Sequence, residues 1–124
     1  MVMPLTAIDR PSASSLDAVE QTIDLQHLAR MTLGERSLER EVLGLFARQA
    51  DMLLPRIRAG APAVAAAFAH TLKGSALGIG AWRLARAAEA VEQAKDGELA
   101  AAVDALATAI AEIKAEVARL LRAN

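Results

Sequence analysis

The stretch "AHTLKGSALGIGAWRLARA", residues 69–87, decides the expected fold. Its apolar residues recur every three or four positions on both sides of Gly80, a spacing typical of amphipathic helices and not of strands. Glycine is a poor helix former and commonly ends a helix. We therefore expect one helix to end at Gly80 and a second to begin near Trp82, antiparallel to the first.

The composition also favours helices. Hydrophobic residues make up 54% of the 124 residues, and much of this fraction is alanine, whereas aromatic residues make up only 2%. A chain of this length is expected to form one domain. The scarcity of β-branched and aromatic side chains argues against a sheet, so we predict an all-α protein.

The same spacing extends outward from the hairpin to further helices. The predicted helices are residues 25–31, 38–60, 62–80, 82–96 and 98–122. Asp24 is a suitable N-cap for the first of them, and Pro62 suits the first turn of the third. Because short connections favour antiparallel neighbours, we predict an up-and-down antiparallel four-helix bundle within a domain of residues 16–124. Residues 1–15 are expected to be a flexible arm, with a short helix beginning near Ser15.

The apolar positions of two helices are expected to form the core. Before Gly60, the positions at helical spacing are Leu38, Val42, Leu45, Phe46, Gln49, Met52, Leu53 and Ile57. In the next helix they are Val64, Phe68, Leu72, Ala76 and Ile79. Because these stripes would be buried, few apolar residues remain for the outer faces, and we expect a monomer.

Several partners and chemistries are disfavoured. The formal net charge is −1 and no basic run is present, so no nucleic-acid partner is expected. The chain has no cysteine, which excludes disulfides and thiolate metal sites. His27 and His70 lack carboxylates at ligand spacing, so we expect no metal site, and we expect His27 to be a solvated side chain. With no apolar run of membrane-spanning length and no signal peptide, the expected location is the cytoplasm.

One face of the helix before Gly80 has the features of a reactive site. His70, Lys73, Gly74 and Leu77 lie on this face, at offsets of three, four and seven residues. A glycine inside a helix costs roughly 0.5–1 kcal/mol relative to alanine, but at Gly74 it leaves the imidazole unshielded. An exposed imidazole is a competent nucleophile near neutral pH, and the Lys73 ammonium would stabilise a phosphoryl group on it.

The chain reversal near Gly80 predicts which residues of the following helix lie beside this face. Residues equally far from the reversal lie at the same height, which pairs His70 with Glu92 and Lys73 with Glu89. A carboxylate at Glu92 would accept a hydrogen bond from one ring nitrogen and leave the other nitrogen facing outward. The alternatives are that Lys73 forms only a surface ion pair with Glu89, and that Glu92 is a solvated carboxylate.

The hexapeptide His-Thr-Leu-Lys-Gly-Ser that begins at His70, with Gly80 ten residues after the histidine, resembles the motif of histidine-containing phosphotransfer (HPt) domains. The resemblance implies that His70 accepts a phosphoryl group on Nε2, that Lys73 attends this group and that Gly74 gives access to it. The implied partners are response-regulator receiver domains, or a hybrid sensor histidine kinase. The implied protein is a phosphocarrier that takes the group from an aspartyl phosphate or a kinase and passes it on.

The resemblance carries further expectations about cofactors and docking. The chain lacks a Gly-rich nucleotide loop, so no ATP binding or autokinase activity is expected. It needs no cofactor of its own, and Mg²⁺ is expected in the partner's receiver domain. The partner is expected to dock on a small apolar patch formed by Ala66, Ala67, Leu77 and Gly78. Two other functions stay open: a receiver- or kinase-binding adaptor that accepts no phosphate, and a bundle that serves only oligomerisation.

Overall fold

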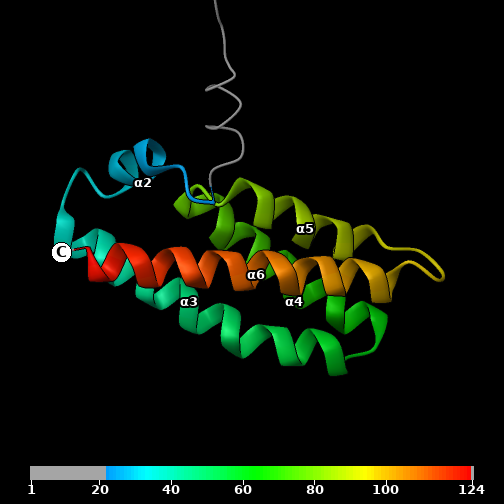
Figure 1. Ribbon diagram of the computed structural model, residues 1–124. Helices are drawn as coiled ribbons and strands as arrows, with labels where there is room; N and C mark the ends of the chain where they lie inside the picture. The colour runs from blue at the N-terminus through cyan, green and yellow to red at the C-terminus, as the bar shows by residue number, and fades with distance from the viewer. Residues whose placement is uncertain (1–21, 124) are drawn as a thin grey trace, which may run out of the picture.

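The computed structural model describes residues 22–123, which are helical apart from short connections (Figure 1). The helices are α2 (Leu25–Met31), α3 (Arg36–Ala59), α4 (Pro62–Ile79), α5 (Trp82–Gln93) and α6 (Leu99–Arg122). No strand occurs between residues 22 and 123, which confirms the all-α class. The arm predicted for residues 1–15 and the helix start predicted near Ser15 lie outside the described residues.

The four long helices contact one another in a closed order. Helix α4 packs between α3 and α5, and α6 packs against both α5 and α3 (Figure 1). Between α3 and α6, Arg58 pairs with Asp104, Asp51 with Lys114, and Arg40 with the carbonyl of Leu121. Residue numbers fall along α3 as they rise along α6 in these contacts, so the two helices run in opposite directions.

Helix α4 ends at Gly80, and two features of the structure require a glycine there. Its φ of 81° lies in the left-handed region, which L side chains rarely adopt. In addition, a Cβ at this position would lie 3.0 Å from both the Cβ and the carbonyl oxygen of Asp24. The backbone N–H of Asp24 donates to the Gly80 carbonyl at 2.9 Å, so the glycine also holds the start of α2 against the α4–α5 turn.

Asp24 joins α2 to α5 through both of its carboxylate oxygens. Oδ1 accepts from the backbone N–H of His27 at 3.1 Å, as an N-cap does, and Oδ2 accepts from Nε1 of Trp82 at 3.1 Å. The rings of His27 and Trp82 meet edge to face with centroids 4.9 Å apart. His27 is therefore half-buried, and the prediction of a solvated side chain is wrong.

Replacing Asp24 with asparagine should destabilise the fold in a pH-dependent way. The hydrogen bond from His27 lowers the pKa of Asp24 most, burial opposes this, and the Trp82 indole lowers the pKa further. The pKa of Asp24 is therefore lower in the folded chain than in the unfolded chain. The ionised carboxylate adds to the free energy of unfolding above the unfolded pKa, and this contribution is lost as pH falls through the folded pKa. Asparagine has only one acceptor oxygen, so its NH₂ group would face either the His27 N–H or the Trp82 N–H. This should lower the free energy of unfolding by about 1–3 kcal/mol.

Urea unfolding of wild type and Asp24→Asn at a series of pH values measures this contribution. The difference in unfolding free energy between the two proteins should be largest near neutral pH. It should decrease as pH falls below about 4, which is near the unfolded pKa of aspartate. A gap that stays constant with pH would contradict the assigned role of the carboxylate.

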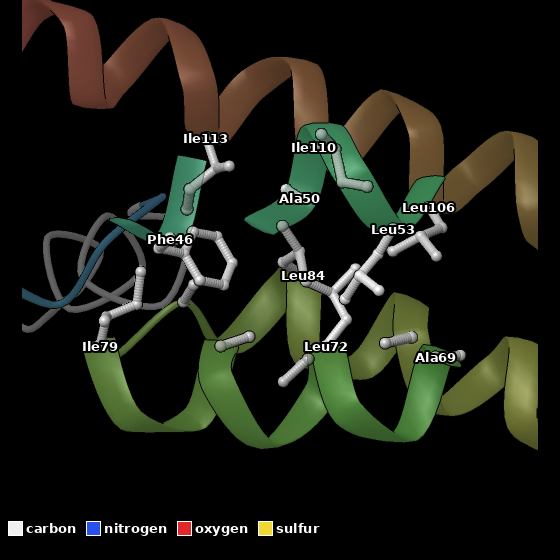
Figure 2. Packing of buried hydrophobic residues seen from close by; sticks show 14 of the residues in the cluster. Phe46, Ala50, Leu53, Ala69, Leu72, Ile79, Leu84, Leu106, Ile110 and Ile113 are labelled. Carbon is white, nitrogen blue, oxygen red and sulfur yellow. The ribbon is translucent and has the colours of Figure 1, made fainter. Parts of the chain in front are cut away.

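The core is built mainly from small residues of α4 and α5 and larger residues of α3 and α6 (Figure 2). In α4 the buried residues are Ala65, Ala69, Leu72, Ala76 and Ile79. The prediction was wrong for Val64, which is 44% exposed, while Phe68 is half-buried under the Arg56 guanidinium. Leu72 and Ile79 are buried as predicted, together with three alanines of α4.

In helix α3 the core prediction is confirmed for Phe46, Leu53 and Ile57 and is wrong for other positions. Its buried residues are Leu43, Phe46, Ala50, Leu53 and Ile57. Leu38, Leu45 and Met52, which were expected in the core, are instead 41%, 53% and 53% exposed. The outer face of α3 is therefore apolar, which removes the basis on which the sequence predicted a monomer.

Candidate functional site

His70 lies on the outer face of α4, about halfway along the helix. Its side chain is 70% exposed, whereas its neighbours Ala69 and Leu72 are fully buried. The helix therefore holds the imidazole on the surface, as its position relative to the buried stripe requires.

Glu92 of α5 orients the imidazole ring. Its Oε2 lies 2.7 Å from Nδ1 of His70, which agrees with the pairing expected from the hairpin reversal. An ionised carboxylate only accepts hydrogen bonds, so the proton of the neutral ring is on Nδ1. Nε2 then carries the lone pair and faces away from α5.

Lys73 contacts the same carboxylate. Its Nζ lies 2.7 Å from Oε1 of Glu92, so one carboxylate joins Lys73 and His70. The predicted pairing of Lys73 with Glu89 is wrong. Glu89 instead accepts a hydrogen bond from Nε2 of Gln93 at 3.1 Å. Lys73 and His70 are thus held by the two oxygens of one carboxylate.

Glu92 and Lys73 shift each other's pKa. Contact with the Lys73 ammonium lowers the pKa of Glu92 most, partial burial opposes this, and His70 lowers the pKa further. The pKa of Lys73 is raised, mainly by Glu92, with burial opposing and Glu89 adding to the rise. Both groups are therefore charged at neutral pH, and Glu92 remains a hydrogen-bond acceptor for His70 over a wide pH range.

Most side chains around His70 are small, so few of them project beside the imidazole ring. A Cβ added at Gly74 or at Gly78 would meet no heavy atom within 4 Å. Leu77 is 44% exposed and Ala67 is exposed, while Ala66 is half-buried. The bare face of α4 that surrounds His70 is thus formed by Ala67, Gly74, Leu77 and Gly78, with Ala66 at its edge.

A groove next to this face was not predicted from the sequence. It is an open hollow of about 350 Å³ between α2, α3 and α4. Its lining includes Met31, Leu38 and Leu45 on one side and Ser75 and Gly78 on the other. The sequence signal for it is the alternating four- and three-residue spacing of Leu38, Val42 and Leu45, which equally fits a buried stripe.

Two other properties bear on possible functions. Within residues 22–123, no group of three or more metal-ligating side chains is placed to hold a metal ion. In the same range, no helix combines the length and the apolar character needed to cross a bilayer.

Comparison with known proteins identifies the family. The family model described as the Hpt domain matches residues 41–123, which is well over half of the chain and includes the whole site around His70. Neither the curated proteins nor the solved structures contain a match to this chain. The matched range begins five residues into α3 and ends one residue after α6, so it covers most of α3 and all of α4, α5 and α6. The chain belongs to the Hpt domain family.

Proposed function

We propose that this chain is a phosphorelay intermediate that accepts a phosphoryl group on Nε2 of His70 from a receiver-domain aspartyl phosphate, or from a kinase, and passes it to another receiver. Hpt domains act in histidine phosphotransfer in two-component phosphorelays and interact with receiver domains and kinases. The observation that carries the proposal is the exposed His70 ring, with Glu92 at Nδ1 and the bare Gly74 one turn away.

The reaction follows from the ring tautomer. A bond forms between Nε2 and phosphorus, and the bond between phosphorus and the aspartyl oxygen breaks, with its electron pair leaving on the carboxylate. The ring keeps its Nδ1 proton and becomes cationic. The Glu92 carboxylate, 2.7 Å from Nδ1, stabilises that charge without a proton transfer. The return step reverses these changes, because the same groups serve both directions.

Lys73 contributes charge to the phosphorylated state. In the structure its ammonium is held by Glu92, which places it one turn from His70. A phosphoryl group on Nε2 brings further negative charge to this face, and Lys73 is the cation on α4 closest to it in sequence. We propose that the Mg²⁺ needed for transfer belongs to the receiver.

The receiver is proposed to dock on the bare face of α4 formed by Ala66, Ala67, Gly74, Leu77 and Gly78. In-line transfer requires the two reacting atoms to approach within about 3–3.5 Å, so side chains beside His70 must be small. The antiparallel up-and-down course of α3 to α6, which the α3–α6 contacts support, holds this face on the outside of the bundle.

Substitutions at Gly74 should separate stability from transfer. Gly74→Ala adds a methyl group in open space, so it should stabilise the helix by roughly 0.5–1 kcal/mol. Gly74→Leu should fold at least as well as wild type but transfer phosphate more slowly, because its side chain stands beside His70. Urea unfolding and the rate of transfer from a phosphorylated receiver measure the two effects.

Ala115→Leu is the matched control, because it adds bulk at an exposed position of α6 and should leave the transfer rate unchanged. Wild-type transfer by Gly74→Leu would show that this face of α4 is not the docking surface.

Phosphotransfer profiling tests the proposed function. The chain is incubated with each phosphorylated receiver domain encoded in the same genome, and the label is followed by electrophoresis. We expect at least one receiver to transfer a phosphoryl group that is labile in acid and stable in base, as a phosphoramidate is. Failure of every receiver and kinase to label the chain, with binding retained, would favour the adaptor, against which the intact set His70, Lys73 and Gly74 now argues.

A further inference from the structure

Helix α3 presents an apolar seam on its outer face. Leu38, Leu45 and Met52 are 41%, 53% and 53% exposed, and the half-buried Val42 and Gln49 lie between them. Successive members of this seam are separated by four, three, four and three residues. This is the a/d spacing of a two-helix coiled coil, and it is distinct from the buried residues of α3, which lie on the adjacent face.

We propose that the seam binds a second copy of this chain, with the two α3 helices packed antiparallel around a twofold axis. This inference concerns the fold's outer surface and does not rest on phosphotransfer. A homodimer uses one patch against itself, so the patch must be self-complementary when it is turned end to end. The α3 seam meets this requirement in the spacing of its apolar residues and in its charge.

The apolar layers fix a small set of possible registers. In an antiparallel coiled coil, a positions of one helix lie opposite d positions of the other. Val42 and Gln49 occupy a positions, and Leu38, Leu45 and Met52 occupy d positions. One register places Val42 opposite Leu45 of the second copy and Leu38 opposite Gln49, and symmetry repeats both layers. A second register, shifted by one heptad, also forms four layers, so apolar contacts alone do not choose between them.

The charged residues beside the seam favour the first register. Glu41 and Arg48 occupy g positions beside the seam, both are exposed, and neither has an ion-pair partner among residues 22–123. In the first register Glu41 of each chain lies opposite Arg48 of the other, which gives two attractive pairs. The shifted register places Arg48 opposite Arg48, and the shift in the other direction places Glu41 opposite Glu41.

A parallel dimer obtains no such pairing. In that arrangement g residues face e residues of the second helix, and the e positions next to Arg48 and Glu41 are Leu53 and Phe46, both buried in the chain's own core. The antiparallel dimer is therefore the arrangement that uses both the apolar seam and the charges of Glu41 and Arg48.

The dimer would be weak and would cover part of the functional surface. The seam extends from Leu38 to Met52, about 21 Å of helix at 1.5 Å per residue, which corresponds to an interface at the low end of the size range. Four of its residues, Leu38, Val42, Leu45 and Gln49, form the α3 wall of the groove whose α4 edge is Ser75 and Gly78. A second copy on α3 and a receiver at His70 would therefore compete for adjacent surface.

Charge reversal tests the dimer and its register together. Sedimentation equilibrium of the full chain between about 5 and 500 µM should show concentration-dependent dimerisation, in the range expected for a small interface. Glu41→Arg and Arg48→Glu should each be monomeric, because each places like charges in both pairs. A mixture of the two variants should form a heterodimer, because opposite charges then meet in both pairs. The double variant should dimerise like wild type.

Cross-linking tests the direction of the helices. The chain has no cysteine, so single cysteines can be introduced without background. A mixture of Val42→Cys and Leu45→Cys chains should form a mixed disulfide under mild oxidation, faster than either variant alone. Preferential cross-linking of each variant to itself would indicate parallel helices and overturn the proposal. A wild-type chain that stays monomeric over the whole concentration range would also overturn it, as would dimers of both single charge variants.

Discussion

Replacing His70 with glutamine should abolish phosphoryl acceptance and leave the fold intact. Nε2 of His70 is the nucleophile in the proposed reaction, and glutamine offers only an amide of similar length, which does not attack phosphorus. The side chain is 70% exposed and contacts Glu92 at the surface, so the unfolding free energy should change by no more than about 0.5 kcal/mol. Transfer from a phosphorylated receiver and urea unfolding measure the two effects.

The other histidine provides the control for this variant. His27→Gln alters a ring that packs against Trp82 at the α4–α5 turn, away from the bare face of α4. It should keep full phosphoryl acceptance even if stability falls. Base-stable label that persists in His70→Gln, or is lost only in His27→Gln, would contradict the assignment of the phosphoacceptor.

Removing the Glu92 carboxylate should slow transfer strongly without preventing it. Glu92→Ala leaves Nδ1 of His70 without its acceptor, so the ring can rotate and take either tautomer, and the cationic product loses its counter-charge. A hydrogen bond to a charged group contributes about 1.5–3 kcal/mol, which corresponds to a rate loss of roughly 10- to 150-fold. The single-turnover rate from a phosphorylated receiver measures this loss.

Glu92→Gln separates positioning from charge. Its amide oxygen can still accept from Nδ1, so the tautomer should be kept while the negative charge is lost, and the rate should lie between those of wild type and Glu92→Ala. Nitrogen chemical shifts of the His70 ring distinguish the two variants, because only Glu92→Ala should show a mixture of tautomers. Equal rates for Glu92→Ala and wild type would mean that the carboxylate does not assist the reaction.

The hairpin and its main pairing could be predicted because both depend on local sequence. Gly80 ends a helix and reverses the chain, and the distance of His70 and Glu92 from that point sets them at equal height. The partner of Lys73 was predicted wrongly, because height along the helices does not define the reach of a long side chain. Glu92 has two oxygens, and the second one binds Lys73 in place of Glu89.

The inward face of α3 could be predicted only in part: Phe46, Leu53 and Ile57 were expected in the core and are buried, whereas Leu43 and Ala50 were missed. Two adjacent faces have helical spacing, one with Leu38, Leu45 and Met52 and the other with Leu43, Ala50 and Ile57. The two faces are similarly hydrophobic, so hydrophobicity alone does not choose between them, and only the second is buried in the folded chain. The position of His27 likewise depends on Trp82, which is distant in sequence and meets it only in the folded chain.

The central claim is that Nε2 of His70 receives the phosphoryl group because Glu92 holds the proton on Nδ1. The most direct test is to phosphorylate the isotopically labelled chain with a receiver and to record long-range nitrogen–proton correlations of the two histidine rings. We expect the nitrogen bonded to phosphorus to be Nε2 of His70, with Nδ1 still protonated, and the His27 ring to be unchanged. Phosphate on Nδ1 of His70, or on His27, would contradict it.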